Sequence, residues 1–293
     1  MKRTLKKLLA VALCALIGLS GGAFVACGGD GNEIKVCASE IPHAEILNGK
    51  VKDLLAEKGY KLTVTVLDWT IQNDSVANGD YDANYFQHIP YLSLYTGRTS
   101  LSATCKVHYE PLGIYYGKAA KGTEVTDGTS FIICADESNG VRALELLKAN
   151  GVFSETSEGD NYPITSDNKF NFQGETWTSA SGVTVTLIPE ENLAGALLDY
   201  DFACLPCNTA LTGKIGSDKR AAVESDPAQV GGKANVLAVR TEDYKNNSAY
   251  KAKIDALTDA LLSADVAAFV AKKYSGIILC NESTQIDLRQ DIK

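Results

Sequence analysis

Residues 79–92 read Gly79-Asp80-Tyr81-Asp82-Ala83-Asn84-Tyr85-Phe86-Gln87-His88-Ile89-Pro90-Tyr91-Leu92. Inside this stretch, Ala83–Phe86 has the composition of a short β-strand. An isolated aromatic residue such as Phe86 is typical of a hydrophobic core, so no single position indicates a function. The stretch becomes informative only as a set of residues, and in the context of the elements on either side of it.

Short apolar runs alternate with helical patterns around this stretch. The runs predict β-strands, and Leu54 and Leu55 before Gly59 predict a helix with a glycine stop. In the first part of the chain we expect strands at 34–38, 62–67, 83–86, 103–109 and 112–116, and helices at 51–59 and 71–78.

A second series of the same kind follows. Its predicted strands are 131–134, 183–188, 202–205 and 235–240, its predicted helices are 141–151, 193–198 and 248–274, and 154–182 is a polar loop region. Alternating strands and helices indicate parallel sheets with helices on both faces, so two series predict an α/β fold with two lobes. Because open α/β sheets bind ligands at the carboxyl ends of their strands, the binding cleft should lie between the lobes.

The first 26 residues have the composition of a secretory signal peptide. Lys2, Arg3, Lys6 and Lys7 precede the apolar run Leu8–Leu19, and small residues follow it. That run is shorter than the about 20 residues that a membrane-spanning helix needs. A buried core helix rarely begins with four cations, so the signal peptide is the better interpretation.

The end of this segment, Phe24-Val25-Ala26-Cys27-Gly28, resembles a bacterial lipobox. Ala26 fits that motif, whereas Phe24 stands where leucine is usual. The resemblance implies acylation of Cys27, and residues 27–32 suit a flexible tether between the lipid and a folded domain. Secretion with a free Cys27 is the alternative.

The charge balance argues against a nucleic-acid partner. The chain has 293 residues, 45% of them hydrophobic, which is enough for a substantial core. Its formal net charge is −8, from 28 basic and 36 acidic residues. Without the four cations of the leader, 24 basic residues face 36 acidic ones and the net charge is −12. A surface of that charge repels phosphate backbones.

Familiar catalytic motifs are missing, so we expect a protein that is not an enzyme and needs no cofactor. The sequence has no phosphate-binding loop, dinucleotide fingerprint or nucleophile elbow. Its three histidines, His43, His88 and His108, could bind zinc, but their spacing provides no local pair of ligands. We therefore predict no metal site, and a zinc-binding lipoprotein remains an alternative.

A second alternative is a thiol oxidoreductase. Cys204-Leu205-Pro206-Cys207 follows a predicted strand and has the Cys-x-x-Cys spacing of redox motifs. Such motifs usually lie near the first strand of a small domain, whereas this pair lies late in the chain. The chain has eight cysteines, and an oxidising compartment permits the six after Cys27 to form disulfides without requiring it.

As a set, residues 79–92 resemble the hallmark motif of the NlpA family of methionine-binding lipoproteins, the substrate-binding components of methionine ABC importers. All fixed positions of that motif match. The resemblance runs from about residue 34 to 275 and is loosest across 154–182. Further agreement is found at Ile41–Leu47, at Asp68-Trp69 followed by Asn73, and at Lys106–Tyr115.

The resemblance implies a two-lobed periplasmic-binding-protein-like fold of type 2, with the ligand in the cleft between the lobes. The ligand-binding residues that it implies are Trp69, Phe86, His88, Arg142, Asn208 and Asn235. Arg142 matches the arginine that pairs with the ligand carboxylate, and the two asparagines match residues that hold the amino-acid backbone. Phe86 and His88 match pocket-wall residues.

These implied roles are chemically reasonable. The planar fork of Arg142 can meet a carboxylate in two bonds, and asparagine oxygens can accept hydrogen bonds from an ammonium group. An aromatic wall suits a thioether. Trp69, however, replaces a tyrosine of the family, and its larger ring would narrow the pocket. Some members of the family take dipeptides or other amino acids, so a dipeptide that contains methionine, or another amino acid, is an alternative ligand.

We therefore predict a lipid-anchored, extracytoplasmic solute-binding protein that captures an amino acid, with L-methionine favoured. Its partners would be an ABC permease and its ATPase subunit, and we expect a monomer anchored on the outer face of the cell membrane. Residues 33–112 and 241–293 should form lobe one and residues 113–240 lobe two. The expected hinges are at residues 111–114 and 235–240.

Overall fold

The computed structural model describes residues 30–225, 231–275 and 277–292. The predicted signal peptide and the predicted lipidation site Cys27 lie outside the described residues. Contacts gather Glu33–Lys293 into one compact unit. No helix of the described ranges is long and apolar enough to cross a bilayer.

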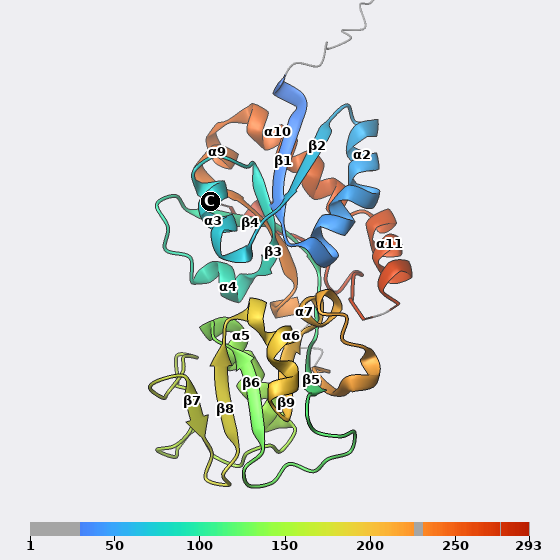
Figure 1. Cartoon of the computed structure of the whole chain (residues 1–293). Helices are drawn as coiled ribbons and strands as arrows, with labels where there is room; N and C mark the ends of the chain where they lie inside the picture. Colours follow the sequence, from blue (N-terminus) through green and yellow to red (C-terminus); the bar gives the residue numbers. More distant parts are fainter. Residues whose placement is uncertain (1–29, 226–230, 276, 293) are drawn as a thin grey trace, which may run out of the picture. The chain divides into compact units, whose positions relative to one another are not determined.

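Lobe one is built on a six-stranded sheet with the order β12-β4-β11-β3-β1-β2 (Figure 1). The strands are β1 (Glu33–Ala38), β2 (Lys61–Val66), β3 (Ala83–His88), β4 (Leu101–His108), β11 (Asn235–Arg240) and β12 (Ile286–Asp287). β1 pairs in parallel with β2 and β3, whereas β11 runs antiparallel to both β3 and β4. The sheet is therefore mixed, and the prediction of purely parallel sheets was wrong.

The helices of lobe one largely follow the predicted pattern. They are α2 (Lys52–Glu57), α3 (Trp69–Ala77), α4 (Ile89–Ser93), α9 (Thr241–Asn246), α10 (Ser248–Leu261) and α11 (Ala264–Tyr274), with π-helical turns at Glu40–Ala44 and Leu47–Val51. The single helix predicted at 248–274 is in fact two helices. The hydroxyl of Ser263 accepts a hydrogen bond from the backbone N–H of Val266 and starts α11 as a new helix.

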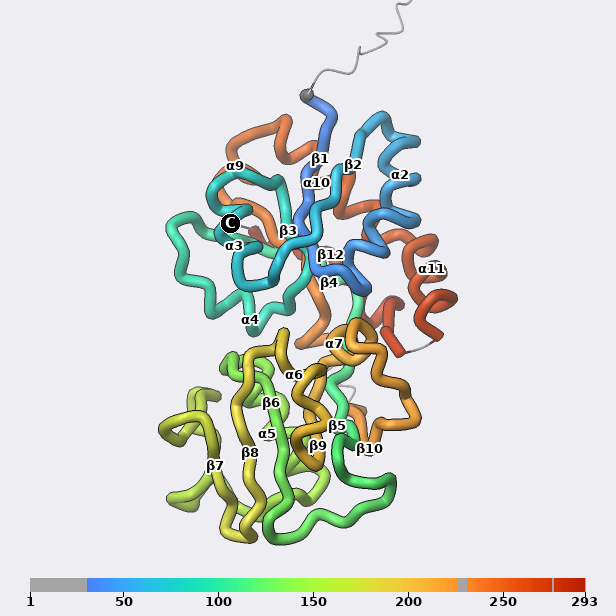
Figure 2. The backbone as a smooth tube through the Cα atoms, in the orientation of Figure 1, coloured from blue at the N-terminus to red at the C-terminus, as the bar shows by residue number. Residues whose placement is uncertain are grey.

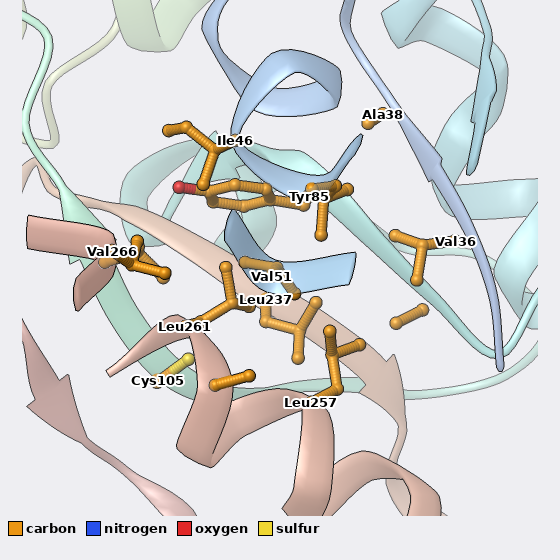
Figure 3. Packing of buried hydrophobic residues seen from close by; sticks show 14 of the residues in the cluster. Val36, Ala38, Ile46, Val51, Tyr85, Cys105, Leu237, Leu257, Leu261 and Val266 are labelled. Atoms are coloured by element: carbon orange, nitrogen blue, oxygen red, sulfur yellow. The ribbon is translucent and has the colours of Figure 1, made fainter. Parts of the chain in front are cut away.

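The core of lobe one contains side chains from segments far apart in the sequence. Figure 3 shows Val36, Val51, Leu237 and Leu257 in this cluster, and all four are fully buried. Because Leu237 belongs to β11, that strand is part of the core of lobe one.

Lobe two is built on a second six-stranded sheet, with the order β10-β5-β9-β6-β8-β7. Its strands are β5 (Leu112–Tyr116), β6 (Ser130–Cys134), β7 (Thr176–Thr178), β8 (Thr184–Ile188), β9 (Phe202–Pro206) and β10 (Arg220–Val223), and its α-helices are α5 (Glu137–Ala149), α6 (Glu190–Ala196) and α7 (Cys207–Thr212). β6 runs parallel to β8 and β9. Two separate hydrophobic clusters contain its buried side chains.

The chain passes from lobe one to lobe two between β4 and β5, so the predicted strands 103–109 and 112–116 belong to different sheets (Figure 2). The lobe boundary predicted after residue 240 needs correction. Residues 235–240 form β11, which pairs with β3 and β4 of lobe one, so the chain has already returned before Asn235.

The position of β11 yields a stability prediction. Replacing Leu237 by alanine should lower the free energy of unfolding by about 2–5 kcal/mol, because it leaves a cavity in the core of lobe one. Leu198→Ala is the matched control, since Leu198 is 63% exposed and its truncation removes little buried surface. Urea unfolding of both variants measures the difference. Equal, small losses would contradict the placement of β11 in this core.

Candidate ligand-binding site

Both lobes contribute to one cavity with about 520 Å³ of space between its walls, part of it at the open mouth. The lining residues are Ser39, Trp69, Phe86, Gln87, His88, Tyr91, Glu110, Asn139, Arg142, Glu190, Pro206, Asn208 and Asn235. All six binding residues implied by the sequence lie on this wall. Whether they bind a ligand stays a prediction.

The topology explains why these residues meet. In lobe one, β3 ends at His88, and the antiparallel strand β11 begins opposite it at Asn235. In lobe two, Glu190 follows β8 and Asn208 follows β9, at the carboxyl ends of strands that lie on either side of β6. Each sheet therefore presents the carboxyl ends of its parallel strands to the cavity, as expected for α/β sheets.

Part of the 79–92 motif forms a hydrogen-bonded network beside the cavity. The side-chain amides of Asn73, Asn84 and Gln87 form a buried hydrogen-bonded network, in which Asn73 donates to Gln87 at 3.0 Å and Asn84 donates to Asn73 at 2.9 Å. Gln87 donates to both asparagines. Buried amides are costly unless they are paired, so this network holds α3 against β3, the strand that carries Phe86 and His88.

His88 links the two lobes. Its Nδ1 accepts a hydrogen bond from the backbone N–H of Tyr91 at 3.2 Å. Nε2 is therefore the protonated nitrogen and donates to Oδ1 of Asn139, on α5 of lobe two, at 3.0 Å. Burial and the nearby charge of Arg142 lower the pKa of His88 to about 4, so the ring is neutral at pH 7.

Arg142 lies on α5 just beyond its first turn. Asp136 caps this helix by accepting from the backbone N–H of Asn139 at 2.9 Å, as its sequence indicates. Nε and Nη2 of Arg142 donate to the two carboxylate oxygens of Glu224, and Nη2 also donates to the backbone oxygen of Glu110 at 2.7 Å. No hydrogen bond joins Nη1 to the described residues, and Arg142 lines the cavity.

The Arg142–Glu224 pair is buried, and only 4% of the arginine side chain and 8% of the glutamate side chain are exposed. Burial alone would raise the pKa of Glu224, but hydrogen bonds from Arg142, its positive charge and the hydroxyl of Tyr109 lower that pKa to about 2. Glu224 is thus ionised at neutral pH and offsets the charge of Arg142.

Asn208 and Trp69 bring unpaired polar atoms to the cavity wall. Oδ1 of Asn208 and Nε1 of Trp69 are buried and have no hydrogen-bond partner. A buried polar atom without a partner costs free energy unless something else pairs with it. Asn235 differs, because its Oδ1 lies 3.3 Å from Nε2 of His43.

The fold brings together two of the three histidines, which their sequence spacing did not predict. Nε2 of His108 lies 2.7 Å from Oε1 of Glu110, and Nε2 of His43 lies 3.3 Å from the same oxygen. Nδ1 of His108 is hydrogen-bonded to the hydroxyl of Tyr85. Burial lowers the pKa of His43 to about 4 and that of His108 to about 3, while burial raises the pKa of Glu110 to about 7.

Two groups of side chains in the described part of the chain are close enough to hold a metal ion. They are His43 with His108 and Glu110, and Cys134 with Asp136 and Glu190. Hydrogen bonds already pair the three residues of the first group with one another and with Tyr85 and Asn235. In the second group, the Cys134 thiol donates to Asp136 at 2.7 Å. The third member of this group, Glu190, accepts a hydrogen bond from the hydroxyl of Thr209 at 2.8 Å.

Seven residues of the cavity wall were not predicted as binding residues: Ser39, Gln87, Tyr91, Glu110, Asn139, Glu190 and Pro206. Glu110 and Tyr91 lie inside motifs that carry the family resemblance, and Asn139 lies in the capping sequence before Arg142. Glu190 lies two residues after the end of the predicted strand 183–188. The rule that ligands bind beyond the carboxyl ends of strands could have identified it.

The cysteines provide no support for thiol chemistry. All six described cysteines are free and buried. Burial raises the pKa of the Cys204 thiol and, well above its usual value, that of the Cys207 thiol. A redox motif needs an accessible thiol with a lowered pKa, so the oxidoreductase alternative is disfavoured.

Two α/β lobes that line a shared cavity define the class of two-lobed solute-binding proteins. Comparison with known families makes the assignment specific: the chain belongs to the NlpA lipoprotein family, whose model matches residues 34–280. The predicted family and the predicted two-lobed fold are thereby confirmed.

Individual relatives agree with this assignment. The methionine-binding lipoprotein MetQ of Bacillus subtilis is 32% identical over 278 residues, which cover 91% of this chain and 97% of the relative. A lipoprotein structure from Ruminococcus gnavus has 32% identity and a TM-score of 0.74, covering 86% of this chain and all of that one. A nutrient-binding protein of Burkholderia cenocepacia, solved with bound methionine, has 26% identity and a TM-score of 0.70, covering 85% and 99%.

The buried ion pair yields a second stability prediction. Glu224→Gln should lower the free energy of unfolding by about 3–5 kcal/mol, because it leaves the charge of Arg142 buried without its counter-charge. Glu145→Gln should change the free energy of unfolding by about 0–1 kcal/mol. Glu145 forms an ion pair with Lys233 at 3.6 Å, but its side chain is half exposed, so water screens the pair. Chemical denaturation at pH 7 distinguishes the two. Similar small losses would show that the Arg142–Glu224 pair is not buried as described.

Glu190 yields a prediction about pH. Burial raises its pKa to about 7, against an ordinary value of 4.5. Between about pH 4.5 and 7 the folded protein therefore keeps a proton that the unfolded chain has released, and this group destabilises the fold as pH rises. The buried histidines have lowered pKa values, so they make the folded state more stable as pH rises. The informative quantity is therefore the difference in stability between the wild type and Glu190→Gln.

We expect the stability of the unliganded wild type, measured relative to Glu190→Gln, to fall as pH rises from about 4.5 to 7. Urea unfolding at a series of pH values measures it. A difference that does not change with pH would contradict the raised pKa of Glu190.

Proposed function

We propose that this protein is an extracytoplasmic, lipid-anchored solute-binding protein that captures L-methionine in the cavity between its lobes and delivers it to an ABC importer. The observation that carries the proposal is the free Nη1 of Arg142 on the same wall as Asn208, Asn235 and the aromatic rings of Trp69 and Phe86. No covalent step is needed for this function.

The chemistry of the wall supports an amino-acid ligand. Arg142 offers a donor for a carboxylate, and the unpaired Oδ1 of Asn208 offers an acceptor for an ammonium group. The rings of Phe86 and Trp69 both face that of Tyr91, with centroids 5.8 and 5.2 Å away. Such an aromatic surface suits a thioether side chain.

The names of the relatives support methionine in particular. One relative is called a methionine-binding lipoprotein, and the structure from Burkholderia cenocepacia contains methionine. A relative from Escherichia coli, 34% identical over 149 residues, is called a D-methionine-binding lipoprotein. Both enantiomers therefore belong in any test. The anchor at Cys27 and the ABC permease with its ATPase are proposed from the lipobox and the family resemblance, and a monomer is our proposed state.

A thermal-shift screen tests the proposal directly. We expect L-methionine to raise the unfolding midpoint, because a ligand at 100 times its Kd stabilises the native state by about 2.7 kcal/mol. The other arms are D-methionine, Gly-Met, the remaining amino acids and zinc chloride. Stabilisation by zinc alone would favour the metal-binding alternative and contradict our proposal.

Asn208→Ala should weaken L-methionine binding by about tenfold or more, because a hydrogen bond to a charged group contributes about 1.5–3 kcal/mol. Folding should be little affected, since Oδ1 of Asn208 has no partner in the protein. Asn192→Ala, at an exposed position on α6, is the matched control. Calorimetric titration measures both affinities, and equal affinities would remove Asn208 from the site.

A further inference from the structure

Glu190 is a carboxylate on the cavity wall whose charge no cation of the described residues compensates. It is the first residue of α6 and lies on the same wall as Arg142. Its Oε1 accepts one hydrogen bond, from the hydroxyl of Thr209 at 2.8 Å. No basic side chain of the described residues forms an ion pair with it. The charges that act on it most, those of Asp136, Glu110 and Glu191, are all negative.

The other charged groups of the cavity have partners. Arg142 is paired with Glu224 through two nitrogens. Oε1 of Glu110 lies 2.7 Å from Nε2 of His108 and 3.3 Å from Nε2 of His43. Glu190 is partly buried. A carboxylate withdrawn from water is costly unless a charge or several donors compensate it, so Glu190 is the exception on this wall.

A second, independent observation concerns Asn208. Its Oδ1 is buried and unpaired, and the residue next to it in α7, Thr209, is the one bonded to Glu190. Glu190 and Asn208 also line a neighbouring cavity together with Trp69 and Ser39. One wall of the site therefore combines a carboxyl group with a neutral acceptor, and neither has a cation or N–H donor from the described residues.

An ammonium group fits this pair of acceptors. It carries one positive charge and three N–H donors, so one group can compensate Glu190 and pair with Asn208. Arg142 is the only Lys or Arg on the described cavity wall, and its free Nη1 is a donor for an anion. The rest of the wall is largely aromatic or neutral, and His88 is uncharged because burial lowers its pKa to about 4.

We infer that Glu190 is a specificity-determining residue that, with Asn208, recognises the α-ammonium group of the ligand. The site thus selects zwitterions with a neutral side chain and excludes ligands whose amino group is blocked. This inference rests on the proposed function, because it assigns the two ends of an amino acid to two parts of the same cavity.

The test compares Glu190→Gln with two ligands that differ only at the amino group. The Gln side chain keeps the shape and can still accept from Thr209, but it lacks the charge. We expect its affinity for L-methionine to fall at least about tenfold, the factor that corresponds to 1.4 kcal/mol. Its affinity for N-acetyl-L-methionine, which the wild type should bind weakly, should change less than about threefold. Calorimetric titration measures all four affinities.

Glu191→Gln is the matched control. It removes the same charge from the adjacent, exposed position of the same helix. We expect wild-type affinity for L-methionine in this variant, whereas an equal loss in both variants would point to a general effect of charge and overturn the inference. The unfolding midpoint of each variant shows whether the fold is intact.

The outcomes separate the two proposals. If the wild type binds L-methionine and Glu190→Gln binds it equally well, the role of Glu190 is wrong and the proposed function stands. The same conclusion follows if the variant loses both ligands by the same factor. If the wild type binds no amino acid, both proposals fail.

Discussion

The carboxylate of Glu224 joins the parts of the structure on which the site depends. It follows β10, where the chain leaves lobe two, and it accepts hydrogen bonds from Tyr109 at 2.6 Å and from the backbone N–H of Leu112 at 3.0 Å, where the chain enters lobe two. It also holds Arg142 through two nitrogens. One buried side chain therefore fixes both connections between the lobes relative to the cavity.

This arrangement determines what Arg142 can do. An arginine paired on one edge is held in a single orientation, and Arg142 lines the cavity in that orientation. Glu224 already compensates the charge of the guanidinium, so this part of the cavity wall carries little net charge. The polar contacts between the lobes, such as His88 with Asn139, place the second half of the wall close by. The site thus depends on both lobes being present.

Much of the fold could be predicted from the sequence, because strand and helix patterns are local. The sequence pattern predicted a helix at 141–151, and α5 begins earlier, at Glu137, because Asp136 caps it. What failed depended on long-range pairing. A strand pattern at 235–240 does not say which sheet it joins, and hydrogen bonding to β3 and β4 places it in lobe one. Glu224 lies 82 residues from Arg142, so nothing local connects them.

In the proposed complex, an amino acid binds with its carboxylate at Arg142 and its ammonium group at Glu190 and Asn208. A crystal structure of the protein grown with L-methionine tests this arrangement most directly. We expect a ligand oxygen within hydrogen-bonding distance of the guanidinium of Arg142, with the ligand nitrogen beside Glu190 and Asn208. Methionine bound in the reverse orientation, or outside this cavity, would contradict it.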